Sequence, residues 1–230
     1  MLFRSHSPGK GVEAVATLSF FVLVFIGLVA VVKRRYSLRP FREDDRERVF
    51  LWRNSDFVAG SSFTRNISWE DHSRWFDEQL LGRGRHNYVF EHNDTPAGVI
   101  AHDPDPRSGV SVFGMYLGRG GVPLGGKMLG LLTLESGFAV LKAGKILGKV
   151  LGSNERALRL YAFLNYEVED VLRGGAIVDG RREDVVLVCM LAERWAEIRE
   201  SVIKKIVGVE VGYEICYDDG DSTKIGRAHV

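Results

Sequence analysis

Apolar and polar positions repeat with two different periods along residues 36–207. Apolar residues recur at helical spacing in some segments, whereas shorter runs are rich in β-branched and aromatic residues. The helical segments are 46–54, 69–80, 125–141, 155–164 and 193–207, and the strand segments are 36–41, 88–91, 97–102, 110–117, 146–151, 166–172 and 185–191. This order, β-α-α-β-β-β-α-β-α-β-β before a last helix, predicts an α+β domain with a mixed sheet.

Turn and capping residues separate these segments. Ser68 precedes Trp69 and two acidic residues, which is typical of a helix N-cap and its first turn. Asn154 stands in the same position before the segment 155–164. The pairs Asn93-Asp94 and Asp179-Gly180 are turn dipeptides between strand segments. They predict a meander in the middle of the domain and a hairpin near its end.

An apolar run precedes the domain. Residues 14–32 contain no charge, and at about 1.5 Å per helical residue the run is long enough to cross a hydrocarbon core. Basic residues cluster directly after it, at 33–35. Because basic flanks stay on the cytoplasmic side, we expect a short tail at 1–13, a retained transmembrane helix at 14–32 and a cytoplasmic domain anchored to the inner membrane.

Two segments follow the domain expected at 36–195. Residues 196–224 continue the last helix and end in a tail. Residues 225–230 read IGRAHV, which matches what a common sequencing-library adapter encodes. We therefore expect 225–230 to be a scar of cloning, with the natural end of the chain cut at an unknown point.

Bulk composition disfavours several classes of partner. Lys and Arg number 31 against 30 Asp and Glu, for a formal net charge of +1, so nucleic acid is not expected to bind. Cys189 and Cys216 are too few and too far apart for a disulfide framework or a metal cluster. Apolar residues make up 45% of the chain, which is enough to fill one core. We expect one domain without a bound metal.

A glycine-rich turn joins the strand segment 110–117 to the helix segment 125–141. It reads GRGGVPLGGK over residues 118–127. Glycines allow close approach of the backbone to a ligand, and free N–H groups at a helix start attract a pyrophosphate. The turn therefore predicts an anion cradle.

A second motif lies downstream of this turn. Residues 154–166 read NERALRLYAFLNY, which resembles the signature N-x-x-A-x-x-L-Y-x-x-x-G-F of the GNAT superfamily of acetyl-CoA dependent N-acetyltransferases. The segments 169–173 and 184–195 resemble the closing strands of that superfamily, and 52–54 with 68–76 resembles its aminosugar N-acetyltransferases of the pseudaminic acid pathway. The resemblance covers 36–195 and implies the GNAT fold, whose mixed central sheet contains two splayed strands.

The resemblance also implies a site. Acetyl-CoA is expected as cosubstrate, in the gap between the strands that end at 115–117 and at 150–152. Tyr161 is the expected catalytic residue, as the general acid that protonates the departing thiolate. The implied cofactor contacts are backbone groups of Tyr116 and Leu117, the turn residues Leu124, Gly125, Gly126 and Lys127, and Asn154.

Several positions depart from the superfamily pattern, among them Gly120, where an Arg or Gln is expected, and Asn165, where a Gly is expected. Pro123 stands where a phosphate-binding glycine is expected, and proline has no N–H to donate. Val112 stands where many relatives carry the acidic general base, so the expected base is missing. A water chain, His72 or His102 are the alternatives, because histidine titrates near neutral pH. None of them is assigned as the base.

The acceptor is expected beside the two early helices. Arg53 and His72 are predicted to face the substrate, since the diphosphate of a nucleotide sugar calls for a guanidinium. The predicted reaction is acetyl transfer to a primary amine, namely the 4-amino group of a UDP-linked aminosugar. Alternatives are acetylation of ribosomal-protein N-termini, of polyamines or of antibiotics, and a degenerate domain that binds acetyl-CoA without catalysis. The sequence does not decide the oligomeric state, and a homodimer is one possibility.

Overall fold

The structure is a computed structural model that describes residues 35–80, 85–207, 213–218 and 223–228, with side chains as far as Val207. The tail expected at 1–13 and the transmembrane helix expected at 14–32 lie outside these residues. Among the helices of the described part, none is long and apolar enough to cross a membrane.

The described chain alternates strands and helices in the predicted order. The strands are β1 (Arg35–Pro40), β2 (His86–His92), β3 (Thr95–Asp105), β4 (Val110–Leu117), β5 (Lys145–Leu151), β6 (Glu167–Val178), β7 (Arg181–Leu191), β8 (Tyr213–Asp218) and β9 (Thr223–Ala228). The helices are η1 (Glu43–Asp45), α2 (Arg46–Asn54), α3 (Asp56–Ala59), α4 (Trp69–Leu80), α5 (Gly125–Glu135), η2 (Ser136–Val140), α6 (Glu155–Phe163) and α7 (Ala192–Val207). The predicted α+β class is confirmed.

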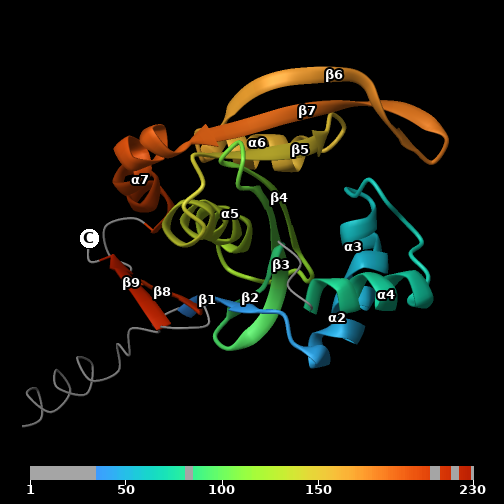
Figure 1. Ribbon diagram of the computed structural model, residues 1–230, viewed down its shortest axis with the longest axis horizontal. Coiled ribbons are helices and arrows are strands. Elements are labelled where there is room, and N and C mark those ends of the chain that lie inside the picture. Colours follow the sequence, from blue (N-terminus) through green and yellow to red (C-terminus); the bar gives the residue numbers. More distant parts are fainter. Residues whose placement is uncertain (1–34, 81–84, 208–212, 219–222, 229–230) are drawn as a thin grey trace, which may run out of the picture. The chain divides into compact units, whose positions relative to one another are not determined.

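These strands form one mixed sheet in the order β6-β7-β5-β4-β3-β2-β1-β8-β9 (Figure 1). The segment from β1 to β4 is an antiparallel meander, whereas β4 and β5 pair in parallel across the crossover made by α5. Strands β8 and β9 extend the sheet beyond β1, although the sequence predicted only a tail there. The mixed sheet expected from the sequence is therefore present and longer than expected.

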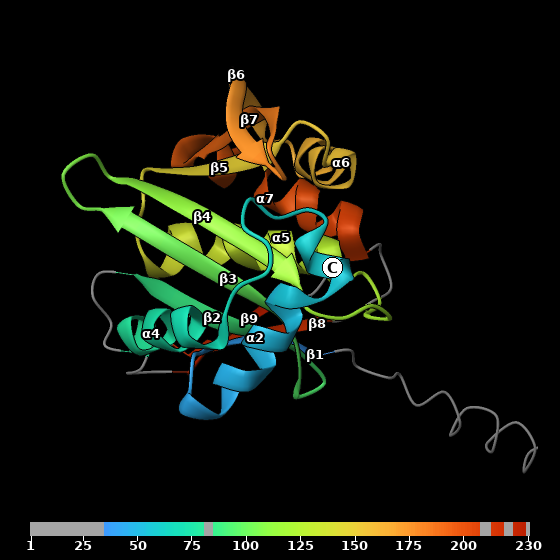
Figure 2. The ribbon, with the colours of Figure 1, turned by 90° about the vertical axis from the view of Figure 1, so that its right-hand side faces the viewer.

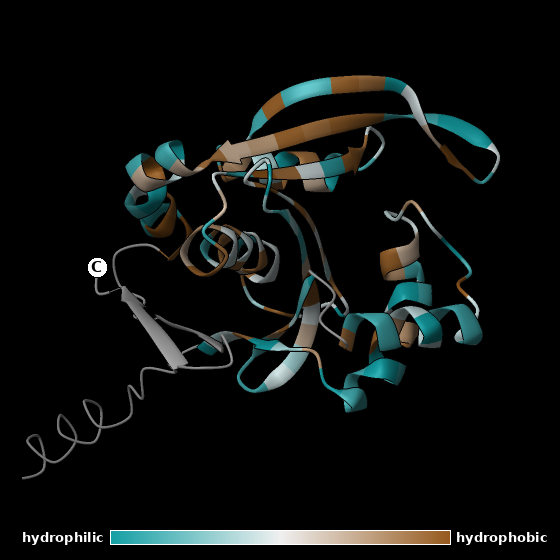
Figure 3. Cartoon of the chain, viewed as in Figure 1, coloured by the Kyte–Doolittle hydropathy of each residue, from teal (hydrophilic) through white to brown (hydrophobic). Residues whose placement is uncertain are grey.

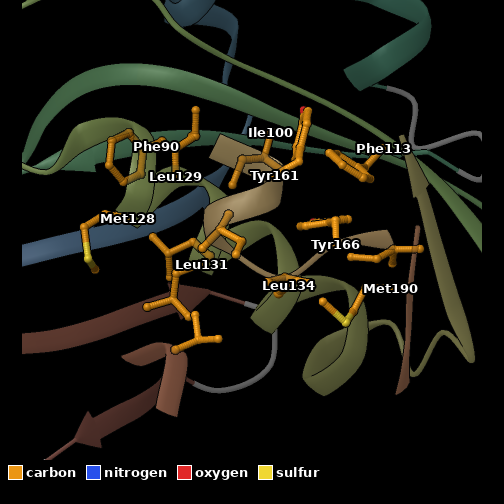
Figure 4. Close-up of a cluster of buried hydrophobic side chains, with 14 of the residues drawn as sticks. Phe90, Ile100, Phe113, Met128, Leu129, Leu131, Leu134, Tyr161, Tyr166 and Met190 are labelled. Carbon is orange, nitrogen blue, oxygen red and sulfur yellow. The ribbon is translucent and has the colours of Figure 1, made fainter. Parts of the chain in front are cut away.

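Helices cover both faces of this sheet (Figure 1). On one face α5, α6 and α7 pack around a core that includes Phe90, Ile100, Phe113 and Leu131 (Figure 4). The other face carries α2 and α4, which are largely hydrophilic on their visible sides (Figure 3) and bury a smaller cluster around Phe76. Helix α5 is buried along nearly its whole length, as expected for a helix that is apolar all round.

The helix predicted at 125–141 changes its winding before its end. Helix α5 stops at Glu135 and continues as the π-helical turn η2, in which the N–H of Leu141 bonds to the carbonyl of Ser136. The Ser136 hydroxyl donates to the Leu132 carbonyl at 2.7 Å and also contacts Nε2 of His102 at 3.0 Å. We infer that this buried serine favours the wider turn, because side-chain hydrogen bonds to a helix carbonyl disturb regular winding.

His102 lies in the core and does not line the cavity described below, so it is not available as a base. Burial lowers its pKa to about 4. An unfolded histidine titrates near 6.5, so the folded state resists protonation, and stability is full above that pH and falls as the pH drops from about 6.5 to about 4. We expect a loss of about 3 kcal/mol over this window.

The measurement is the midpoint of urea unfolding at several pH values between 7 and 4. His102→Asn should flatten this pH dependence, because the asparagine amide does not titrate. A dependence of equal steepness in the variant would place the acid sensitivity in other groups.

Candidate active site

The central feature of the site is a gap between β4 and β5. These strands pair only as far as Phe113 and Gly148, although β4 continues to Leu117 and β5 to Leu151. Beyond that point each strand stays paired on its outer side, with β3 and β7 respectively, so their inner edges diverge (Figure 2). The predicted splay is confirmed, and it leaves backbone groups free to bind a ligand as an added strand.

The hydrogen-bond phase of β4 decides which groups face the gap. The Gly118 N–H donates to the Ala97 carbonyl at 2.9 Å. Because backbone direction alternates along a strand, Tyr116 also points its N–H and C=O toward β3, whereas Met115 and Leu117 point theirs toward the gap. The expected backbone contact of Leu117 agrees with this phase, but that of Tyr116 is wrong. Tyr116 lines the cavity, and its ring lies beneath the Arg53 guanidinium.

The glycine-rich turn closes one end of the gap. Leu124 adopts a left-handed conformation (φ +52°) as the N-cap of α5, and the Tyr36 hydroxyl donates to the Pro123 carbonyl at 2.7 Å. The N–H of Gly125 is used inside the turn, by the Val122 carbonyl. The N–H groups of the following residues, Gly126 and Lys127, stand at the positive end of the helix without a partner within it. The turn therefore keeps an anion-binding end despite Pro123.

A cavity of about 950 Å³ contains this gap and the turn. Its lining includes every residue that the sequence singled out for the site. These residues are Arg53, His72, Tyr116, Leu117, Leu124, Gly125, Gly126, Lys127, Asn154 and Tyr161. The structure thus brings together two sequence motifs and two early helices in one place.

Tyr161 reaches the cavity from α6. Its ring packs edge-on against Phe113 and Tyr166, with ring centroids 5.8 and 5.1 Å away (Figure 4). Burial raises the pKa of the Tyr161 phenol above its ordinary value, so the group is fully protonated at neutral pH. A protonated phenol in a fixed position is what a proton donor requires.

Asn154 and Lys127 have local roles in this structure. The Asn154 side-chain oxygen accepts the N–H of Ala157 at 3.1 Å and so caps α6, as the sequence predicted. Its amide NH₂ and the second lone pair of that oxygen then remain to contact a cofactor. The Lys127 ammonium lies over the ring of Phe163, 4.3 Å from its centroid.

A compact loop over residues 55–66 forms the opposite wall. The Asn54 side chain closes its base by two hydrogen bonds to the backbone of Ile67, of 2.9 and 3.1 Å. Arg53 lies beneath the loop, where it donates to the Ser62 hydroxyl at 3.2 Å and stacks over the ring of Tyr116. This loop was not predicted from the sequence, because side-chain hydrogen bonds that close a short loop leave no periodic pattern of apolar residues.

His72 lines the cavity but is a packing residue. It is almost fully buried, its Nε2 bonds to the Arg46 carbonyl at 2.8 Å, and its ring packs among Phe50, Trp75 and other aromatic side chains. Burial lowers the pKa of His72, which further favours the neutral form. We therefore withdraw the expectation that His72 faces the substrate.

The charges in the cavity are strongly unequal. Its lining contains one carboxylate, that of Asp71, which bonds the Ser68 hydroxyl at the start of α4. The cationic lining residues are Arg53, Arg119, Lys127, Lys149 and Arg156. Among the described residues none of these cations forms an ion pair, whereas most other described arginines do. Unpaired cations around a cavity indicate a ligand with several negative charges.

Val112 does not line the cavity, although the next residue, Phe113, does, so the position of the expected base contributes nothing to the lining. Among residues 35–80 and 85–207 no cluster of His, Cys, Asp and Glu has the composition of a metal site. The lining thus offers a proton donor in Tyr161 and no free carboxylate base.

Comparisons with known proteins agree with this geometry. No protein-family model and no curated protein matches the sequence. The fold is similar to that of spermidine N-acetyltransferase from Vibrio cholerae in complex with CoA and spermine, with a TM-score of 0.64, 17% identity, and coverage of 70% of this chain and 98% of that one. A candidate acetyltransferase from T. thermophilus matches with a TM-score of 0.61 and 25% identity, over 73% of this chain and 92% of that one.

The fold is therefore the GNAT fold predicted from the sequence, and both of these neighbours are described as acetyltransferases, the first of them in complex with CoA. A further similar structure is a dodecamer of the Vibrio cholerae enzyme, which matches with a TM-score of 0.59 and 18% identity over 70% of this chain and 95% of that one.

Proposed function

We propose that this chain transfers the acetyl group of acetyl-CoA to a primary amine. The observation that carries the proposal is the open edge of β4 at Met115 and Leu117, which ends at the N-terminus of α5 and has Tyr161 on its wall. Pantetheine amides add to the strand edge, and the pyrophosphate binds at Gly126 and Lys127.

The reaction is direct attack. The amine nitrogen attacks the thioester carbonyl carbon, a tetrahedral oxyanion forms, and the C–S bond breaks as the carbonyl returns. Tyr161 donates its proton to the departing thiolate, and the amine loses a proton to water in the cavity, which restores the phenol through solvent. N–H groups at the open edge of β4 stabilise the oxyanion.

The acceptor is an amine that also carries negative charge, such as a UDP-linked aminosugar. Arg53 supports this choice, because its guanidinium lies on the acceptor side, over Tyr116, without a carboxylate partner in the described part of the chain. A polyamine would need several carboxylates, and Asp71 is the lone acid in the lining. The same shortage of acidic residues in the lining disfavours the N-terminus of a protein as the acceptor, because that acceptor would call for an acidic channel.

The first test is calorimetric titration of the protein with acetyl-CoA, followed by acetylation assays with a UDP-linked aminosugar and with spermidine. We expect micromolar binding of acetyl-CoA and turnover of the nucleotide sugar in preference to the polyamine. A folded protein that binds no acetyl-CoA would contradict the proposal. Binding without turnover of any amine would favour a non-catalytic acetyl-CoA binding module.

Arg53→Gln tests the acceptor assignment. We expect KM for the UDP-aminosugar to rise roughly 10- to 100-fold, the equivalent of one lost charge-assisted contact, while the affinity for acetyl-CoA stays unchanged. The matched control is Arg159→Gln, since Arg159 is an exposed arginine on α6 that pairs with Glu155, and neither residue lines the cavity. Equal KM values in both variants would exclude a phosphate contact by Arg53.

A further inference from the structure

Two lysines share one aromatic ring at the rim of the cavity. The ammonium of Lys127, at the start of α5, lies 4.3 Å from the centroid of Phe163, and that of Lys205, on α7, lies 4.2 Å from the same centroid. Lys205 also donates to the Phe163 carbonyl at 3.1 Å, at the end of α6. Three helices that are far apart in the sequence therefore place two positive charges beside one side chain.

These two charges are not neutralised. Within residues 35–80 and 85–207 neither ammonium forms an ion pair with a carboxylate. Because both ammonium groups lie within 4.3 Å of one ring centroid, their like charges repel each other, and contacts with an aromatic face and a helix carbonyl offset only part of that cost. An anion that contacts both ammonium groups would reduce the repulsion.

The position of Lys127 and Lys205 indicates which anionic group of a ligand they contact. Lys127 lines the cavity beside the N-terminus of α5, where the proposed function places the pyrophosphate. Phe163 follows Leu160, the cavity residue one turn earlier on α6, and does not line the cavity itself. Lys127 thus lines the cavity beside the proposed pyrophosphate position, whereas Phe163 and Lys205 lie just outside the lining. In CoA the group one step outward from the pyrophosphate is the ribose that carries the 3′-phosphate.

We propose that Lys127 and Lys205 bind the 3′-phosphate of CoA, so that the chain distinguishes CoA from 3′-dephospho-CoA. This inference rests on the proposed function. It assigns a cofactor-selecting residue, Lys205, to α7, a helix that supplies no residue to the cavity lining. The 3′-phosphate carries about two negative charges, which matches two ammonium groups.

The test is calorimetric titration of the full chain with CoA and with 3′-dephospho-CoA, for the original protein and for Lys205→Gln. We expect the original protein to bind CoA at least about 10-fold more tightly than dephospho-CoA, and Lys205→Gln to lose most of that ratio through weaker binding of CoA alone. Lys204→Gln is the matched control, because Lys204 is an exposed neighbour on the same helix without a contact to Phe163. Lys204→Gln should keep the ratio between the affinities for CoA and for dephospho-CoA.

Equal affinities of the original protein for the two ligands would overturn the inference and leave the proposed function intact. Equal weakening of both ligands in Lys205→Gln would also overturn it, since Lys205 would then act by holding α6 and not by contacting the phosphate. Failure of the original protein to bind either ligand would overturn the proposed function and this inference together.

Discussion

Tyr161→Phe should lower the rate of acetylation by roughly 10- to 1000-fold and leave the affinity for acetyl-CoA nearly unchanged. The substitution removes the phenol proton and keeps the ring, which packs against Phe113 and Tyr166. The folded protein therefore loses a proton donor without losing its packing. The measurement is kcat with saturating acetyl-CoA, together with a calorimetric Kd.

Tyr166→Phe is the matched control. Tyr166 lies 5.1 Å from Tyr161 between ring centroids, its hydroxyl is buried without a hydrogen-bond partner in the described structure, and it does not line the cavity. Loss of an unpaired buried hydroxyl should leave the rate unchanged and stability equal or slightly higher. An unchanged rate in Tyr161→Phe, or an equal loss in both variants, would remove Tyr161 from the proton transfer.

The pH dependence of the reaction follows from the same group. Burial raises the pKa of Tyr161, so the phenol stays protonated through neutral and mildly alkaline pH. Loss of activity on the acid side therefore reflects protonation of the acceptor amine and not of this residue. This agrees with a cavity that holds a proton donor and no free carboxylate base.

Local sequence signals predicted much of this molecule. Helix α2 and strand β4 have the predicted bounds, because apolar periodicity and turn residues fix short elements without help from the rest of the chain. Asn154 as a cap and Tyr161 in the cavity followed from one motif on a single helix. Residues that act within one helix are those that sequence patterns describe best.

Features that depend on pairing between distant segments were not predicted. The backbone groups of Met115, and not those of Tyr116, face the gap because of the hydrogen-bond register between β3 and β4. The sequence of one strand alone does not reveal that register. The packing role of His72 depends on aromatic side chains from two helices. Strands β8 and β9 required an edge of β1 to pair with, and the tail sequence gave no sign of it.

Replacement of Asp45 by alanine should cost about 3–5 kcal/mol of the free energy of unfolding, the largest stability change that we expect from one side chain. The Asp45 carboxylate is fully buried and accepts two hydrogen bonds from Arg39, at 2.6 and 2.8 Å, and one from the Arg42 N–H at 2.9 Å. Alanine would leave the largely buried Arg39 guanidinium with Glu91 as its one carboxylate partner, beside the Pro40 carbonyl.

The same network has a predictable pH dependence. Burial alone would raise the pKa of Asp45, but hydrogen bonds from Arg39 and from the Arg42 backbone reverse this and lower it below the ordinary value. A lowered folded pKa means that the contribution to stability is present above the ordinary carboxyl pKa, near 4, and is lost as the pH falls below it. Asp45→Ala should therefore remove part of the acid sensitivity below pH 4, whereas His102→Asn acts above it.

The measurement is denaturant unfolding at pH 7, monitored by tryptophan fluorescence, with Asp44→Ala as control. Asp44 is the exposed neighbour of Asp45 in η1 and should change stability by less than about 0.5 kcal/mol. Asp45 anchors the chain where β1 leads into α2, and the last turn of α2 carries Arg53 into the acceptor wall. A loss below about 1 kcal/mol would mean that the buried ion network is close to neutral in energy and that the packing of Val49 and Phe76 alone holds this wall in place.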